Sequence, residues 1–77
     1  MRIRLYGRLA DAIGPEIHLD PTERSVGAIR QQLASGHPVA EQELARSRAI
    51  VDAAAVADDQ VVGESDALEF LPPVSGG

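Results

Sequence analysis

The chain has no cysteine, no lysine and no tryptophan, and only one tyrosine and one phenylalanine among its 77 residues. The absence of cysteine excludes disulfide bonds, thiolate catalysis and thiolate metal sites, and it fits a reducing compartment. No apolar run approaches the ~20 residues that a membrane span requires. The N-terminus has no apolar segment of signal-peptide length. We therefore expect a cytoplasmic protein that makes no membrane contact.

Positive charge is also scarce. Seven arginines stand against twelve acidic residues, and the net charge is −5. Nucleic-acid phosphates would repel such a chain, so we expect no nucleic-acid partner. The missing lysines are explained most simply by genomic base composition. A chain of 77 residues has room for one small core, so a partner should supply most of any active site.

Three stretches alternate apolar and polar residues, which predicts half-buried strands. They are residues 1–7, 16–20 and 67–71. The first two are separated by a segment that ends in Gly14-Pro15, which predicts a hairpin with a long loop. In the last stretch Leu68 and Phe70 share one face, and we expect both side chains to point into the core.

One main helix is predicted at residues 26–35. Its apolar positions recur at helical spacing; they are Val26, Ile29 and Leu33. Thr22 or Ser25 is suited to cap its N-terminus, and Gly36 is suited to cap its C-terminus.

The remainder of the chain is less regular. Residues 39–45 predict a second short helix, 48–52 a strand and 60–62 a short edge strand. Residues 53–57 are too rich in alanine for periodicity to decide. The order of elements is typical of an α+β fold of the β-grasp (ubiquitin-like) class, with a mixed sheet of four to five strands packed on one main helix. We assign residues 1–71 to this domain and 72–77 to a flexible C-terminal tail.

The tail carries the most specific signal. It follows the last strand as Phe70-Leu71-Pro72-Pro73-Val74-Ser75-Gly76-Gly77. A terminal Gly-Gly pair alone arises by chance in roughly one chain in 200 at average glycine usage, so a frayed end or an expression scar is the ordinary alternative. The whole segment, however, closely resembles the C-terminus of the molybdopterin synthase small subunits, the MoaD-like branch of the MoaD/ThiS ubiquitin-like sulfur carrier family. The order of strands and helix before it resembles the same family over nearly the whole chain.

The resemblance implies a role for Gly77. In this family a ubiquitin-activating-type adenylyltransferase uses ATP to adenylate the C-terminal glycine, which is then converted to a thiocarboxylate. The thiocarboxylate donates its sulfur to a cyclic pterin precursor held in the large subunit, in an expected heterotetramer with two copies of each subunit. No bound cofactor is implied, and general acid–base groups would come from the large subunit. The expected partner-binding residues precede Gly77: Leu71, Pro72, Pro73, Val74, Ser75 and Gly76.

The physical chemistry of the tail agrees with this role. Pro72 and Pro73 fix φ near −65° and stiffen the start of the tail as an extended arm. From Pro72 to Gly77 an extended chain spans roughly 20 Å. Gly76 and Gly77 lack a Cβ atom, so they can enter a narrow channel. Because a terminal carboxyl group is ionised at neutral pH, it must be activated before it accepts sulfur.

Other functions remain open at this point. The chain could carry sulfur for thiazole or cysteine synthesis, modify target proteins as a ubiquitin-like modifier, or act as a plain β-grasp binding module. His18 and His37 are isolated histidines without a third ligand, and we predict no metal site.

Overall fold

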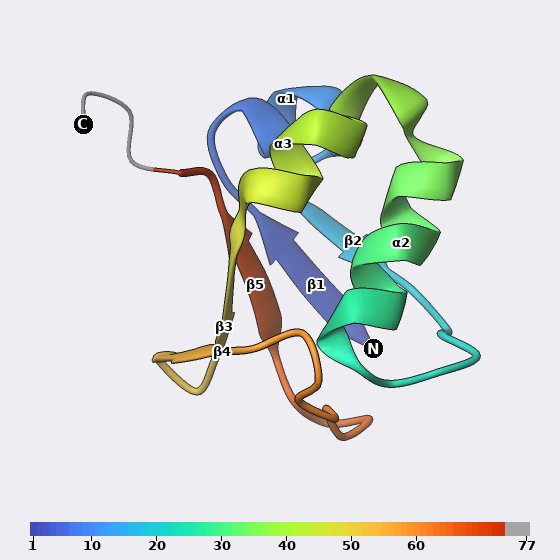
Figure 1. Cartoon of the computed structure of the whole chain (residues 1–77), viewed down its shortest axis with the longest axis vertical. Coiled ribbons are helices and arrows are strands. Elements are labelled where there is room, and N and C mark those ends of the chain that lie inside the picture. Colours follow the sequence, from blue (N-terminus) through green and yellow to red (C-terminus); the bar gives the residue numbers. More distant parts are fainter. Residues whose placement is uncertain (74–77) are drawn as a thin grey trace.

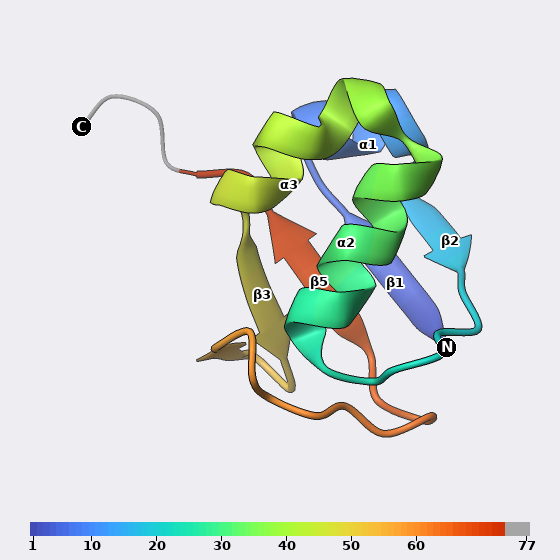
Figure 2. The ribbon, with the colours of Figure 1, turned by 45° about the vertical axis from the view of Figure 1, so that its right-hand side comes forward.

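The computed structural model describes residues 1–73. Its elements, in chain order, are β1 (Arg2–Leu5), α1 (Arg8–Ile13), β2 (Glu16–His18), α2 (Val26–Gly36), the 3₁₀-helix η1 (Pro38–Ala40), α3 (Glu41–Arg46), β3 (Arg48–Val51), β4 (Ala54–Val56) and β5 (Leu68–Leu71). The strands form one sheet and the helices lie together on one face of it (Figures 1 and 2).

The sheet has the strand order β2-β1-β5-β3-β4. Two antiparallel hairpins, β1–β2 and β3–β4, lie on either side of β5. Strand β5 runs parallel to β1 and antiparallel to β3, so the last strand occupies the centre of the sheet. A mixed five-stranded sheet packed on a main helix confirms the predicted α+β, β-grasp fold class.

The core lies between the sheet and α2. Burial alternates along β1 and β5, as their sequence pattern predicts, and Leu68 and Phe70 are both 0% exposed. Helix α2 supplies the opposite wall through its predicted apolar positions: Val26, Ile29 and Leu33. At about 25 cal/mol per Å² of apolar area, burial of these side chains is the main source of stability.

Two predictions in the first half of the chain need correction. The loop between β1 and β2 contains a short helix, α1, that the alternation analysis did not predict; Leu9 anchors it in the core. Ser25 caps α2 as expected, since its Oγ accepts a hydrogen bond from the Ala28 N–H at 3.2 Å. Gly36, however, belongs to the helix itself, and His37 is the C-cap residue.

In the second half, the short helix at 39–45 is η1 followed by α3, and the strand at 48–52 is β3. The alanine-rich segment at 53–57, for which periodicity did not decide between helix and strand, contains β4. A tight turn at Asp52 and Ala53 folds the chain back onto β3. The predicted edge strand at 60–62 is wrong: only Val61 forms an isolated bridge, with Ser25. The edge position is occupied by β4 instead.

Candidate functional site

Strand β5 leads directly into the tail. It is hydrogen-bonded to a strand on each side, and it ends at Leu71. Leu71 follows the buried Phe70 and is 36% exposed, so the register of β5 turns it outward. The tail therefore begins at the central strand of the sheet.

The first proline of the tail packs on the folded domain. Pro72 is half-buried while Pro73 is exposed. A Cβ atom at Gly7 would lie 2.9 Å from Cγ of Pro72, so glycine at this position leaves room for the proline. Gly7 also has φ 59° and ψ −133°, a conformation that side chains disfavour. The end of β1 and the start of the tail thus fit together at this point.

The remaining tail residues lie outside the part of the chain that the structure describes: Val74, Ser75, Gly76 and Gly77. The reactive role of Gly77 and the partner contacts of the other three remain predictions. The division between a domain at 1–71 and a tail at 72–77 also remains a prediction.

Leu71 and Pro72 form the base of the tail. Polar side chains lie beside this base, on the face of the sheet opposite the helices. The Tyr6 hydroxyl donates a hydrogen bond to Oε2 of Glu69. This bond raises the pKa of Tyr6, because the nearby carboxylate favours the protonated phenol. Arg4 Nε donates to Oε1 of Glu16 at 3.4 Å, and that hydrogen bond raises the pKa of Arg4. At neutral pH Tyr6 is therefore a neutral donor. The sequence analysis missed the Tyr6–Glu69 pair, because its partners are far apart in the chain.

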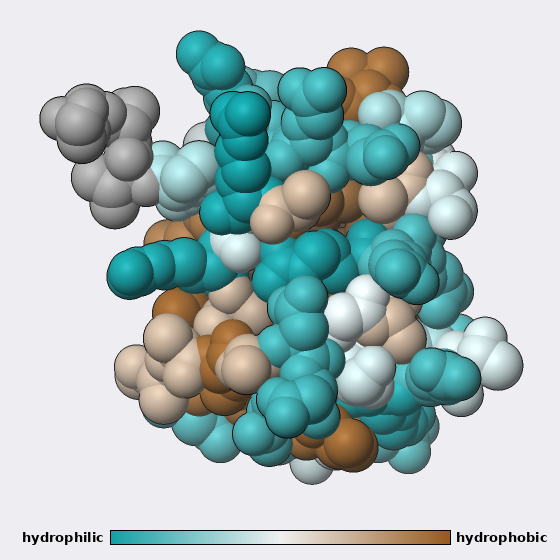
Figure 3. Space-filling view, in the orientation of Figure 1, coloured by the Kyte–Doolittle hydropathy of each residue, from teal (hydrophilic) through white to brown (hydrophobic). Residues whose placement is uncertain are grey.

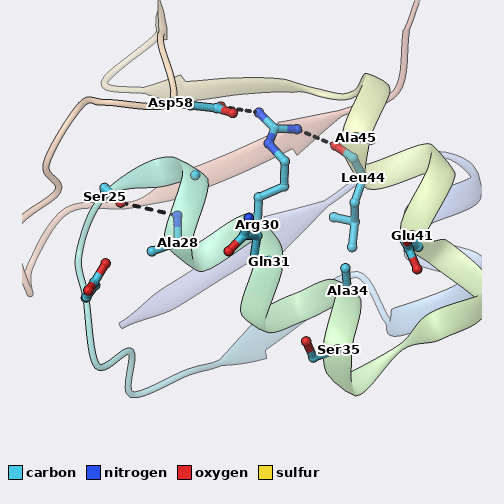
Figure 4. A pocket seen from close by; sticks show the side chains of 12 residues that line it. Ser25, Ala28, Arg30, Gln31, Ala34, Ser35, Glu41, Leu44, Ala45 and Asp58 are labelled. Carbon is cyan, nitrogen blue, oxygen red and sulfur yellow. Dashed lines mark hydrogen bonds and ion pairs between the residues drawn. The ribbon is translucent and has the colours of Figure 1, made fainter.

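A groove of about 680 Å³ lies on the opposite side of the molecule, along α2 and α3 (Figure 4). Arg30 is one of the residues that line this groove, and its guanidinium group contacts other parts of the chain. One nitrogen of its guanidinium group donates to the carbonyl oxygens of Leu44 and Ser47, and the other lies 3.0 Å from Oδ1 of Asp58. The guanidinium carbon also lies 5.1 Å from the centre of the Phe70 ring. Arg30 therefore links α2 to the end of α3, to Asp58 and to β5, and we assign it a structural role.

We expect Arg30→Met to lower the free energy of unfolding by about 2–3 kcal/mol. The substitution keeps an apolar stem but removes the donor to the Ser47 carbonyl and the ion pair with Asp58, and a buried acceptor left unpaired costs about 1–3 kcal/mol. The Leu44 carbonyl still accepts from the Ser47 N–H and hydroxyl. Urea denaturation measures the change. Arg2→Met is the matched control, because Arg2 is exposed and makes only a 3.9 Å ion pair; it should change stability by less than about 0.5 kcal/mol. Equal effects of the two substitutions would contradict a structural role for Arg30.

The face over α2 and α3 is mostly hydrophilic, whereas hydrophobic residues gather over the β3–β4 hairpin at the lower left (Figure 3). Within residues 1–73, no three histidine, aspartate or glutamate side chains form a cluster that could hold a metal ion. No helix in that part of the chain is long and apolar enough to cross a membrane. The base of the tail is consequently the best candidate for a functional site.

Comparisons with known proteins give one matching family model and solved structures with the same fold as this chain. A family model described as the ThiS family matches residues 3–77. A search of the curated proteins gives no match. Among solved structures, small archaeal modifier protein 1 of H. volcanii shares 21% identity at a TM-score of 0.74, with 95% of each chain covered. A Pyrococcus furiosus protein assigned provisionally as molybdopterin converting factor subunit 1 shares 20% identity at a TM-score of 0.75, again with 95% of each chain covered.

A third solved structure is a complex of subunits 1 and 2 of the molybdopterin-converting factor from Helicobacter pylori 26695. The matched chain has a TM-score of 0.68 and 13% identity, with 99% of this chain and 96% of that chain covered. At these identities the structural matches show the β-grasp fold, and the family model covers nearly the whole sequence.

Proposed function

Because this chain belongs to the ThiS family of ubiquitin-like sulfur carriers, we propose that it is the sulfur-donating small subunit of molybdopterin synthase. The observation that carries the proposal is the position of the tail. The segment Pro72-Pro73-Val74-Ser75-Gly76-Gly77 continues from the central strand, β5. A terminus that must enter two different active sites needs a firmly held base and a narrow end, and this arrangement supplies both.

The proposed chemistry begins at the Gly77 carboxylate. One carboxylate oxygen attacks the α-phosphorus of ATP on the activating enzyme and displaces pyrophosphate, which forms an acyl adenylate. Sulfide-level sulfur from a donor then attacks the acyl carbon and displaces AMP, which leaves a thiocarboxylate. The thiocarboxylate sulfur attacks a carbon of the cyclic pterin precursor in the large subunit and displaces an oxygen substituent from that carbon. Hydrolysis of the resulting acyl–sulfur bond leaves sulfur on the precursor and restores the carboxylate. Two such transfers supply the two sulfurs of the dithiolene.

The activating enzyme and the large subunit must each recognise the small subunit in turn. The H. pylori structure contains subunits 1 and 2 together, which supports a large-subunit partner for this chain; we propose a heterotetramer with two copies of each subunit. Gly76 and Gly77 have no side chains, so affinity must come from residues before them. Leu71 is an exposed leucine at the start of the tail, beside the exposed ring of Tyr6, and contiguous exposed apolar patches often mark partner sites.

We expect Leu71→Ala, and separately Val74→Ala, to weaken binding to the purified large subunit by more than about 1 kcal/mol, since anchor side chains fill partner pockets. Isothermal titration calorimetry measures the affinity. Val39→Ala is the matched control, because Val39 is 92% exposed but lies on η1, away from β5. Unchanged affinity in folded Leu71→Ala and Val74→Ala proteins would place the interface elsewhere, with the arginine-bearing face of β1 as the next candidate.

Reconstitution tests the molybdopterin assignment itself. Thiocarboxylated chain, large subunit and the cyclic pterin precursor should together yield the dithiolene product, with the chain returned to its carboxylate form. If the thiocarboxylate forms but no precursor is converted, the chain serves another sulfur pathway, such as thiazole or cysteine synthesis. The likeness to an archaeal modifier protein is to a chain of 21% identity, and attachment of this chain to other proteins would favour that second function.

A further inference from the structure

The exposed face at the base of the tail is not purely apolar. Leu5 pairs with Phe70 across β1 and β5, so the next residues of each strand, Tyr6 and Leu71, come side by side. Both point away from the core, with exposed fractions of 37% and 36%. On the other side of β5, the half-buried Ile50 pairs with Glu69. A partner that covers Leu71 must therefore also come close to Tyr6 and Glu69.

Glu69 lies in the middle of this face and is half-buried. Its backbone neighbours across the sheet are Arg4 on β1 and Ile50 on β3. Oε2 of Glu69 accepts the Tyr6 hydroxyl hydrogen bond, whereas Arg4 is engaged with Glu16 on β2. Among residues 1–73, no group donates a hydrogen bond to Oε1 of Glu69.

A docking partner changes the surroundings of this carboxylate. In the free protein, water solvates the exposed side of Glu69. A partner that covers the face removes that water, and a carboxylate without enough hydrogen-bond donors is then unfavourable. Tyr6 supplies one donor from within the chain and, through the same bond, holds its ring in a fixed position before binding. Fixing a side chain in advance reduces the entropy lost on association.

We propose that Tyr6 and Glu69 form a recognition pair that selects a partner whose docking surface brings a hydrogen-bond donor to Oε1 of Glu69. Such a donor can be a backbone N–H, a hydroxyl, an amide or an arginine. A partner that places a carboxylate or only apolar atoms there is disfavoured, because specificity arises from unpaired groups as well as from new contacts. The inference rests on the proposed function in taking the large subunit as the partner.

The test compares affinities for the large subunit among the native sequence, Tyr6→Phe, Glu69→Gln and the double variant. Glu69→Gln should weaken binding at least about tenfold, because loss of one member of a covered charge-assisted hydrogen bond mainly speeds dissociation. Tyr6→Phe should weaken binding by about fivefold or more, since it removes the donor that satisfies Glu69. The double variant should bind no more weakly than Glu69→Gln alone, because the two residues act through one hydrogen bond.

Glu16→Gln is the matched control. Glu16 is an exposed carboxylate on the same face that bonds Arg4, but it lies on the edge strand β2; its substitution should leave affinity within about twofold. Urea denaturation of every variant verifies that folding is unchanged. If the native sequence binds and both Tyr6→Phe and Glu69→Gln bind equally well, the recognition pair is wrong while the proposed function stands. If the native sequence does not bind the large subunit at all, the proposed function fails.

Discussion

Phe70→Ala should destabilise the domain by about 3–5 kcal/mol, the usual cost of truncating a buried phenylalanine. Phe70 is 0% exposed and stands on the central strand between Leu5 of β1 and Ala49 of β3. Its ring also lies beneath the Arg30 guanidinium group. A domain of this length has a total stability on the order of 4–12 kcal/mol, so the variant should be largely unfolded or close to it. Urea denaturation and thermal unfolding followed by circular dichroism measure the loss.

Leu71→Ala provides the matched comparison, because Leu71 is the next residue but points outward. Its substitution should cost less than about 1 kcal/mol, as surface changes generally do. The contrast between two adjacent side chains tests the register of β5, since a slip of one residue would exchange their faces. A Phe70→Ala protein as stable as Leu71→Ala would show that the assigned register is wrong.

Deletion of Gly77 should abolish sulfur transfer. The shortened chain still ends in glycine, but its carboxyl group lies one residue, about 3.5 Å, closer to the domain. Displacements of about 1 Å at a reacting centre can already cost on the order of a hundredfold in rate, so adenylation should fall below detection. Thermal unfolding should be unchanged within about 0.5 kcal/mol, because β5 ends six residues earlier, at Leu71.

Val39→Ala is the control for this deletion. Val39 is exposed on η1, and its substitution leaves the whole tail intact, so the variant should still be adenylated. A marked loss of stability in the deletion variant would contradict the separation of tail and domain. Normal sulfur transfer by the deletion variant would contradict the role of Gly77.

The elements that the sequence predicted well are those with strong periodicity. Strands β1 and β5 have one buried face, and α2 has an apolar stripe over three turns, so a single pattern decides each. Helix α1 was missed because it is short: only Leu9 is buried in it. The spacing of Leu9 and Ile13 was the available signal, but Gly7 and Gly14 indicated a loop. Strand β4 was undecided because alanine fits helix and strand alike.

The candidate site also has one part that the sequence predicted and one part that it did not. The tail was predictable because its residues are contiguous in sequence, from Leu71 through Gly77. The pairing of Tyr6 with Glu69 and the contact of Gly7 with Pro72 were not, because each joins residues that lie more than sixty positions apart and meet only when β5 inserts beside β1. Contacts of this kind depend on the strand order, which no local pattern specifies.

The central claim is that Gly77 carries sulfur, and intact-protein mass spectrometry tests it most directly. The chain is incubated with ATP, a ubiquitin-activating-type adenylyltransferase and a sulfur donor, and the Gly77 deletion variant is treated in parallel. We expect the native chain to gain the mass difference between sulfur and oxygen, with the change located in the C-terminal fragment, and the deletion variant to remain unaltered. An unaltered native chain under conditions in which the enzyme consumes ATP on a known carrier would contradict the account.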